Sequence, residues 1–531
     1  MTTSQFPERP NLEQLKKQAK GLLKSAHSQD PGVRLANRTR FRVIPALAQK
    51  TESELAALHL ALHDAQSVVA RERGFPSWNA LRERVELVNL KFDEAAEALV
   101  RSATCPQLPR ARQLLALVPS LARANFWTAL VTGEAAAVHD ALGKNPALAT
   151  TPGGPHRLAP IHYVAHSRFA TIPGAPYAAG LLDIARELLT RGADANAYYI
   201  EQGAKLPVLW GATCEAPHPA LAQLLLTAGA NPNDGESLYH AAERGDTVML
   251  DLLAAHGAQT DGGAGAEPWD NTPLCFILGH YAGLAHDADV RRGAAWLLAR
   301  GANPNHVCYR KKSAETPLHV AARHWDAAMI ELLVAHGADL HTRRADGRTA
   351  LTLAELNGRT SAAGALRAHG AVAELSLEEK FIAACMRGDR EEALQLRDPK
   401  FVAANSQQFL EAGEVAIETM LACGFDIATT GNMGETKLHW AAFTGSLPST
   451  RLLLAHGASL TTRDKVHNAP PLGWCFYSSL NERGPRTDFP GVARALLEAG
   501  ATLDEDQEAG AADDVLEVVA EFRRQRGATP S

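Results

Sequence analysis

The residues of this sequence that could do chemistry are grouped in a few short stretches. HLALHD, at 59–64, places His59 and His63 four residues apart and adds Asp64. On one helix, histidines at this spacing face the same way and can bind zinc, as they do in HExxH proteases. The stretch lacks the glutamate that activates water in such enzymes, and no cysteine lies nearby. Core or helix-capping histidines are the alternative, and we favour it.

Two further stretches are weaker candidates. HDAD at 286–289 could gather a hard cation, but the sequence offers no fellow ligands for it. TDGGAGAEPWDN at 260–271 is rich in glycine, yet it follows no strand and contains no lysine, both of which a phosphate-binding loop requires. No P-loop, GxSxG or zinc-ligand spacing is visible. We therefore predict no catalytic residue, no metal ligand, no cofactor and no enzymatic activity.

Another histidine belongs to a phrase that recurs, TPLH at 316–319, with TKLH at 436–439, APIH at 159–162 and TPLC at 272–275. His319 therefore shares its slot with His162 and His439. Elsewhere that slot holds unrelated residue types: Cys275, Tyr239, Thr352 and Gly473. A catalytic or metal-binding residue would not be duplicated in some copies and replaced by different chemistry in others. The pattern indicates a structural histidine.

A second phrase follows the first, with apolar residues, a short spacer and then Gly-Ala, as in ELLVAHGAD and RLLLAHGAS. From Leu318 to Gly337 the separation is 337 − 318 = 19 residues. The same 19 residues separate three other pairs: Leu238 and Gly257, Leu351 and Gly370, Leu438 and Gly457. A histidine precedes the glycine at 256, 336, 369 and 456, where it can interact with the last carbonyls of a helix.

These two phrases, at a period near 33, resemble the ankyrin repeat, most clearly over 158–370 and 425–503. The resemblance implies an all-α solenoid of stacked helix pairs joined by short hairpin loops. Thr316 can cap the first helix, Pro317 suits its first position, and Gly337 can end the second helix. One pair cannot bury its apolar face alone, so stacking makes the core continuous.

The remaining sequence sets the domain boundaries. Residues 1–92 lack both phrases and are predicted as a small helical bundle or end cap, which resembles the start of certain bacterial ankyrin-repeat proteins. We expect a first array over 93–375 with degenerate leading repeats, a second over 376–503, and a capping helix and tail over 504–531. Insertions at 166–180, 280–292 and 480–490 each follow a first helix, where they form candidate specificity loops or plain surface loops.

The composition restricts the function classes. The net charge is −6 and no block of five like charges occurs, so a nucleic-acid binder is not indicated. The seven cysteines form no CxxC pair, which argues against a disulfide framework and for a reducing compartment. No apolar stretch is long enough to span a membrane, and no secretory signal is visible. We expect a cytoplasmic monomer.

We predict a protein-binding scaffold that receives a partner on its concave face, and a partner with an acidic surface. The candidate contacts are irregular residues at variable positions: Arg310, Lys311, Lys312, His324, Trp325, Arg343, Arg344, Phe443, Tyr281 and Phe489. Trp325 replaces a turn glycine, so it either packs beneath a neighbouring loop or anchors a partner. The alternative function is a small-ligand or metal-dependent sensor or enzyme built on the bundle or the insertions.

Overall fold

The recurring phrases fold as helix pairs because each pair carries its own start and stop. In the computed structural model, Thr316 precedes helix α18 (Pro317–His324), and Pro317 takes the first position, where no N–H partner is needed. The second helix, α19 (Ala327–Ala335), is followed by Gly337 with a φ of 87°. Glycine adopts this left-handed conformation without strain, so it ends the helix as the sequence predicts.

The chain divides into two compact units. Unit 1 comprises Met1–Asn89 with Leu375–Ser531, and unit 2 comprises Leu90–Glu374. The N-terminal bundle therefore groups with the second array. The structure describes residues 10–174, 176–201, 203–261, 272–280, 287–308, 313–481, 484, 487–503 and 510–526.

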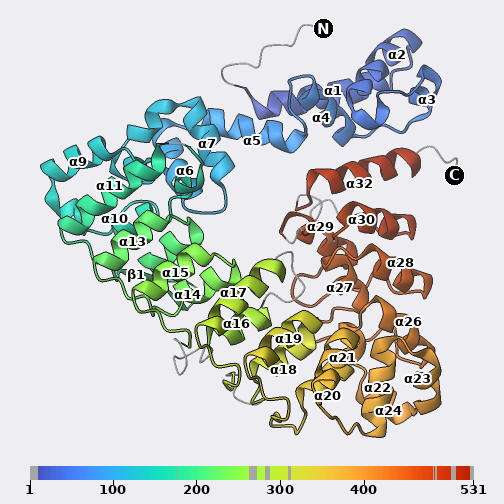
Figure 1. Ribbon diagram of the computed structural model, residues 1–531. Coiled ribbons are helices and arrows are strands. Elements are labelled where there is room, and N and C mark those ends of the chain that lie inside the picture. The colour runs from blue at the N-terminus through green and yellow to red at the C-terminus, as the bar shows by residue number, and fades with distance from the viewer. Residues whose placement is uncertain are drawn as a thin grey trace. The chain divides into compact units, whose positions relative to one another are not determined.

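Unit 2 is an array of helix pairs in which like helices pack on like. The first helices α14, α16, α18 and α20 contact one another in series, and so do the second helices α13, α15, α17, α19 and α21 (Figure 1). The described elements of unit 2 besides α18 and α19 are α6 (Phe92–Ala103), α7 (Leu108–Leu117), η3 (Pro119–Arg123), α8 (Phe126–Thr132), α9 (Ala135–Lys144), η4 (Pro146–Ala149), α10 (Pro160–Ala165), η5 (Arg168–Thr171), α11 (Tyr177–Thr190), β1 (Tyr198–Glu201), β2 (Ala204–Pro207), α12 (Val208–Trp210), η6 (Gly211–Glu215), α13 (Pro219–Thr227), α14 (Ser237–Glu243), α15 (Thr247–Ala255), α16 (Pro273–His280), α17 (Asp287–Ala299), α20 (Ala350–Leu356) and α21 (Thr360–Ala368).

The first helices approach closely because their facing residues are small. Ala321 and Ala322 of α18 are fully buried, as is Leu333 of α19. Gly293 of α17 leaves no room for a methyl group, since a Cβ there would lie 1.8 Å from the Ala242 carbonyl oxygen of α14. The core is thus a continuous layer of small and aliphatic side chains between successive pairs.

One hairpin of unit 2 departs from the predicted all-helical pattern. β1 and β2 pair as antiparallel strands, with Tyr198 opposite Pro207. The sequence YYIEQGAKLP explains the difference, because aromatic and β-branched residues favour strands and Gly203 turns the chain at a φ of 86°. Tyr198 and Ile200 lie on the same strand face and are both exposed.

Unit 1 combines the predicted bundle with a second array. The bundle has its own apolar core, in which Phe41, Val68 and Leu81 are fully buried. The described elements of unit 1 are α1 (Leu12–Ala26), α2 (Pro31–Thr39), η1 (Arg40–Val43), η2 (Pro45–Leu47), α3 (Glu52–Ala57), α4 (Leu62–Arg71), α5 (Trp78–Asn89), α22 (Leu377–Arg387), α23 (Arg390–Leu396), α24 (Pro399–Ala404), α25 (Gln408–Glu411), α26 (Glu414–Ala422), α27 (Lys437–Phe443), α28 (Leu447–Ala455), α29 (Pro471–Asn481), α30 (Phe489–Glu498) and α32 (Asp513–Arg526). The predicted all-α architecture of stacked helix pairs is confirmed.

Candidate functional site

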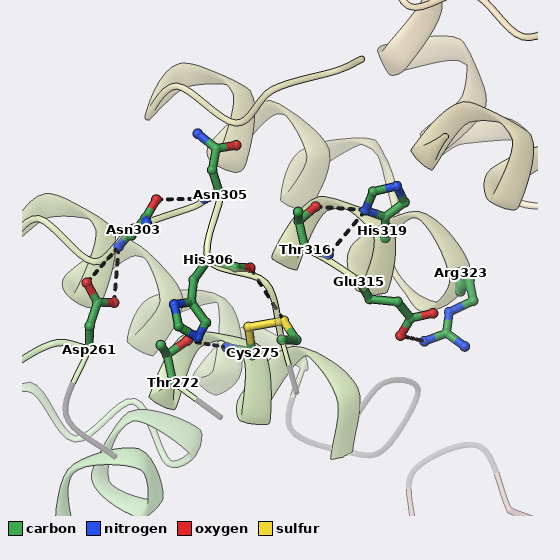
Figure 2. The surroundings of a disulfide bond; sticks show 11 residues. Asp261, Thr272, Cys275, Asn303, Asn305, His306, Glu315, Thr316, His319 and Arg323 are labelled. Atoms are coloured by element: carbon green, nitrogen blue, oxygen red, sulfur yellow. Dashed lines mark hydrogen bonds and ion pairs between the residues drawn. A yellow bond between two sulfur atoms is a disulfide. The ribbon is translucent and has the colours of Figure 1, made fainter. Parts of the chain in front are cut away.

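The recurrent histidine holds the start of its own helix, and His439 also reaches the following hairpin. Thr436 donates to Nδ1 of His439 from its backbone N–H at 3.1 Å, and the Thr436 hydroxyl lies 2.9 Å from the same nitrogen. Nδ1 is therefore the acceptor and Nε2 carries the proton, which it donates to the Ala469 carbonyl at 3.2 Å. Thr316 makes the same two contacts with His319, at 3.2 and 2.8 Å (Figure 2).

Burial keeps these rings neutral. It lowers the pKa of both His319 and His439 below the ordinary value, although carbonyl groups of the next hairpin act in the opposite direction. Each ring bonds the threonine at the start of its own helix. Among the residues that the structure describes, no three His, Cys, Asp or Glu side chains lie close enough together to hold a metal ion. The geometry is that of a structural histidine.

The repeat that begins APIH breaks this arrangement. Ala159 stands where Thr316 and Thr436 stand elsewhere, so no hydroxyl reaches His162, and its buried Nδ1 has no hydrogen-bond partner. The side chain is 1 % exposed. Burial, with a smaller effect of the neighbouring His166, lowers the pKa of His162 to about 3. From the sequence, His162 was treated as equivalent to His319 and His439. In the structure it lacks the hydrogen bond to Nδ1 that the other two accept.

His59 and His63 do not lie on one helix, so their spacing does not bring them onto a shared helix face where both could bind one metal ion. The chain leaves α3 before His59 and starts α4 at Leu62, since the Asp64 carboxylate accepts the Ala61 backbone N–H at 2.9 Å and thereby fixes a new helix start. His59 is exposed, whereas Asp64 is fully buried.

Asp64 is also committed to ion pairs. It lies 3.3 Å from Nε2 of His63 and accepts a hydrogen bond from Arg524 of α32. Burial pushes the pKa of Asp64 upward, but the contacts with His63 and Arg524 hold it below its usual value. In HDAD, Asp289 pairs with Arg292 at 2.5 Å, while His286 and most of the glycine-rich stretch at 260–271 lie outside the described residues.

Two of the predicted basic contact residues, Arg343 and Arg344, lie in one hairpin and differ in how far their charge is already paired. The Arg344 guanidinium pairs with Glu315 at 2.6 Å and with Asp346 at 3.2 Å, so its charge is largely balanced by these two carboxylates. Arg343 is exposed and, among the residues that the structure describes, donates to the Gly347 carbonyl at 2.8 Å. The other three, Arg310, Lys311 and Lys312, lie outside the described residues, as does Tyr281.

The predicted aromatic contacts divide between core and surface. Trp325 is 4 % exposed, and its indole N–H donates to the Leu278 carbonyl at 2.9 Å, which is the packing role that the sequence left open. Phe489 is buried as well. His324 and Phe443 are partly exposed. In this structure, therefore, Trp325 and Phe489 are held in the core, and Phe443 is left as the surface aromatic.

Phe443 belongs to a larger group that the sequence analysis missed. The rings of Trp440, Phe443 and Trp474 meet edge to face, with centroids 5.5 to 5.8 Å apart. Beyond them on α29, Tyr477 is 60 % exposed and Leu480 is 57 % exposed. Trp474 itself is buried, so the other four residues, Trp440, Phe443, Tyr477 and Leu480, form what we call the α27–α29 aromatic surface. Aligning TKLHWAAF with PPLGWCFY would have revealed it, because Trp440 and Trp474 hold the same slot, as do Phe443 and Tyr477.

A hairpin with outward positive charge adjoins this surface. Asp464 is 2 % exposed and accepts the Trp474 indole N–H at 3.0 Å together with backbone N–H groups of Val466, His467 and Ala469. Burial opposes ionisation, but these donors lower the pKa of Asp464 to about 2. Its charge is thus satisfied internally, while Lys465 and His467 are exposed.

One disulfide bond corrects the expectation from the cysteine count. Cys275 of α16 is joined to Cys308 in the following hairpin (Figure 2). The bond ties the first helix of one repeat to the hairpin that follows it, 33 residues further along the chain. A search for CxxC spacing does not detect such a pair. The other five cysteines are free thiols.

The described helices include none that is both long and apolar enough to cross a membrane. Profiles of the ankyrin repeat match residues 297–354, as "Ankyrin repeats (many copies)", and residues 433–465, as "Ankyrin repeat".

Among curated proteins, the chain is 39 % identical to ARF GTPase-activating protein Git of Drosophila melanogaster over 67 residues, 13 % of this chain and 9 % of that protein. It is 34 % identical to Ankyrin repeat and SOCS box protein 11 of Danio rerio over 116 residues, 22 % of this chain and 34 % of that protein. It is 30 % identical to human Rabankyrin-5 over 240 residues, 42 % of this chain and 20 % of that protein.

The chain thus spans about a third or less of the length of these relatives. Of the solved structures, the human ASB11 ankyrin repeat domain is 24 % identical, with a TM-score of 0.35, and the match covers 47 % of this chain and all of that one. The ankyrin repeat domain of Bcl-3 is 20 % identical, with a TM-score of 0.23, and the match covers 44 % and 91 %. The profile matches and the repeat geometry agree that this chain contains ankyrin repeats.

Proposed function

We propose that this chain is a non-enzymatic scaffold that binds a partner protein at the α27–α29 aromatic surface. The observation that carries the proposal is the exposure of Tyr477 and Leu480 on α29, the helix that Phe443 of α27 contacts through Trp474. α29 buries most of its other side chains, so the helix is already anchored in the core without Tyr477 and Leu480. Aromatic residues are enriched among the residues that dominate binding energy at protein interfaces.

Charge identifies the partner's chemistry. Lys465 and His467 extend from the adjoining hairpin, and Asp464 contributes no outward negative charge because its donors are internal. An acidic segment that carries an apolar or aromatic anchor suits such a surface. Arg343 offers a further exposed cation on another repeat, in line with the acidic partner predicted from sequence. Cytoplasmic location and a monomeric state are part of the same proposal.

The alternative, a metal-dependent or small-ligand site in the bundle, has less support. Its candidate residues His63 and Asp64 are engaged with each other and with Arg524. No second function is therefore proposed.

The test is cross-linking mass spectrometry of the purified full chain in an extract of its source cells. The double variant Tyr477→Ser, Leu480→Ser removes two exposed anchors, and Val248→Ser, at an equally exposed valine of α15, is the matched control. We expect a specific protein, linked near the 461–469 hairpin, whose capture falls about tenfold in the double variant and is unchanged in the control, as loss of a binding hot spot predicts. Capture should also weaken with added salt.

Equal capture by the double variant would remove the aromatic surface from the proposal. Failure to capture any protein above an unrelated protein of similar charge would remove the scaffold function itself.

A further inference from the structure

The disulfide occupies the place of a structural histidine. In the phrase TPLC, Cys275 stands in the slot of His319 and His439. The threonine that serves the histidine is still present, because Thr272 is fully buried and its hydroxyl accepts the Cys275 backbone N–H at 3.3 Å. This repeat has therefore kept the cap and changed only the connecting side chain.

Both connections run from a first helix to the hairpin that follows it. His439 of α27 reaches the Ala469 carbonyl, 30 residues further along the chain. Cys275 of α16 reaches Cys308, 33 residues further along. The first connection is a hydrogen bond and is indifferent to thiol chemistry, whereas the second is a covalent bond that a thiol can exchange.

We propose that the Cys275–Cys308 bond is a redox-controlled replacement for the histidine link, which fixes residues 303–308 of the hairpin to α16 when oxidised and releases them when a dithiol reduces it. One reductant thiolate attacks a protein sulfur and forms a mixed disulfide, and the second reductant thiol displaces it. The products are two protein thiols and one oxidised, cyclic reductant. A thiol is too weak a donor to restore the link.

Other contacts determine which side of the hairpin is released and which side stays attached. Asn305 donates to the Gly337 carbonyl at 2.8 Å and accepts the Asp339 N–H at 2.7 Å, so the hairpin stays attached to the next repeat. Reduction therefore separates the hairpin from α16 rather than unfolding it. In the sequence, residues 309–312 lie between the linked Cys308 and the start of α18, and they carry the basic residues of the predicted binding set.

The experiment compares hydrogen exchange in the full chain with and without dithiothreitol, alongside a thiol count on the denatured protein. We expect five free thiols in the oxidised protein and seven after reduction, since five of the seven cysteines are unpaired. Amides of Asn305 and Cys308 should then exchange about tenfold faster or more, as expected when local opening becomes easier. The Val466 amide, in the hairpin tied by His439, is the internal control and should not change.

The variant Cys275→His, Cys308→Ala rebuilds TPLH beside the existing Thr272. It should keep the hairpin amides protected and make them insensitive to dithiothreitol, whereas Cys275→Ala, Cys308→Ala should exchange fast under both conditions. Three results would overturn the proposal: seven free thiols before reduction, five free thiols after it, or unchanged exchange once the bond is open. The wild-type comparison decides the matter even if the rebuilt variant does not fold.

Discussion

The unpartnered nitrogen of His162 allows the structural role of the repeat histidine to be tested by adding a bond rather than removing one. Replacing Ala159 with threonine recreates the TPLH cap seen at Thr316 and Thr436. The new hydroxyl should donate to Nδ1 of His162, which is buried and has no partner. We expect Ala159→Thr to stabilise this repeat.

The magnitude follows from what the buried nitrogen lacks. A buried hydrogen bond contributes about 0.5–1.5 kcal/mol net, and an unsatisfied buried acceptor costs about 1–3 kcal/mol. Ordering a single threonine side chain offsets part of this gain. We therefore expect the free energy of local unfolding to rise by about 1–2 kcal/mol, which slows exchange of the α10 amides by a factor of about 5–30.

Native-state hydrogen exchange suits the measurement, because repeat proteins open segment by segment and a single melting temperature averages over the array. Ala159→Val is the matched control, since valine has the shape of threonine without the hydroxyl. The double variant Ala159→Thr, His162→Ala completes a mutant cycle. If valine slows exchange as much as threonine, or if threonine has the same effect without the ring, hydrogen bonding to His162 is not the cause.

Two further predictions concern the same packing. As the pH falls from 6.5 towards 3, the unfolded chain binds a proton at His162 that the folded ring, with a pKa of about 3, does not accept. Stability should therefore fall by up to about 1.4 kcal/mol per pH unit in this window, and urea titrations of a His162→Gln variant should show a shallower dependence. Gly293→Ala should cost about 2–3 kcal/mol or more in urea unfolding, because its methyl group would meet the Ala242 carbonyl. Gly364→Ala, in an exposed helical position with open space, should instead be neutral or stabilise by up to about 1 kcal/mol.

The sequence predicts well the features that one repeat contains within itself. Thr316, Leu318 and Gly337 define a helix start, a buried face and a helix end within about twenty residues, and all three behave in the structure as expected. The structural role of the histidine was predicted by comparing slots, because unrelated replacements are incompatible with catalysis.

Features that join neighbouring repeats were harder to predict. Arg344 pairs with Glu315, 344 − 315 = 29 residues earlier, and this pairing decides how much positive charge that hairpin offers. Trp325 donates to the Leu278 carbonyl 47 residues away, so its indole N–H is satisfied by a residue of the preceding repeat. Propensity and helical periodicity act over a few residues and are insensitive to such distances. The spacing of His59 and His63 was misleading for a local reason. It puts them on one face only if one helix contains both, and the Asp64 cap starts a new helix between them.

At Cys275, where the histidine is missing, the following hairpin is tied by a covalent bond instead. The Trp474 indole adds a second contact to the hairpin that His439 already holds, because it donates to Asp464. An exposed hairpin has little core of its own, so at least one strong side-chain contact must hold it against the helices. The disulfide at Cys275 has chemistry that the histidine lacks, because it makes the link sensitive to thiols. The buried Trp474 ring contacts Trp440 and Phe443 of the proposed binding surface. In this ankyrin array, the positions that depart from the repeat pattern are therefore the first ones to test for function.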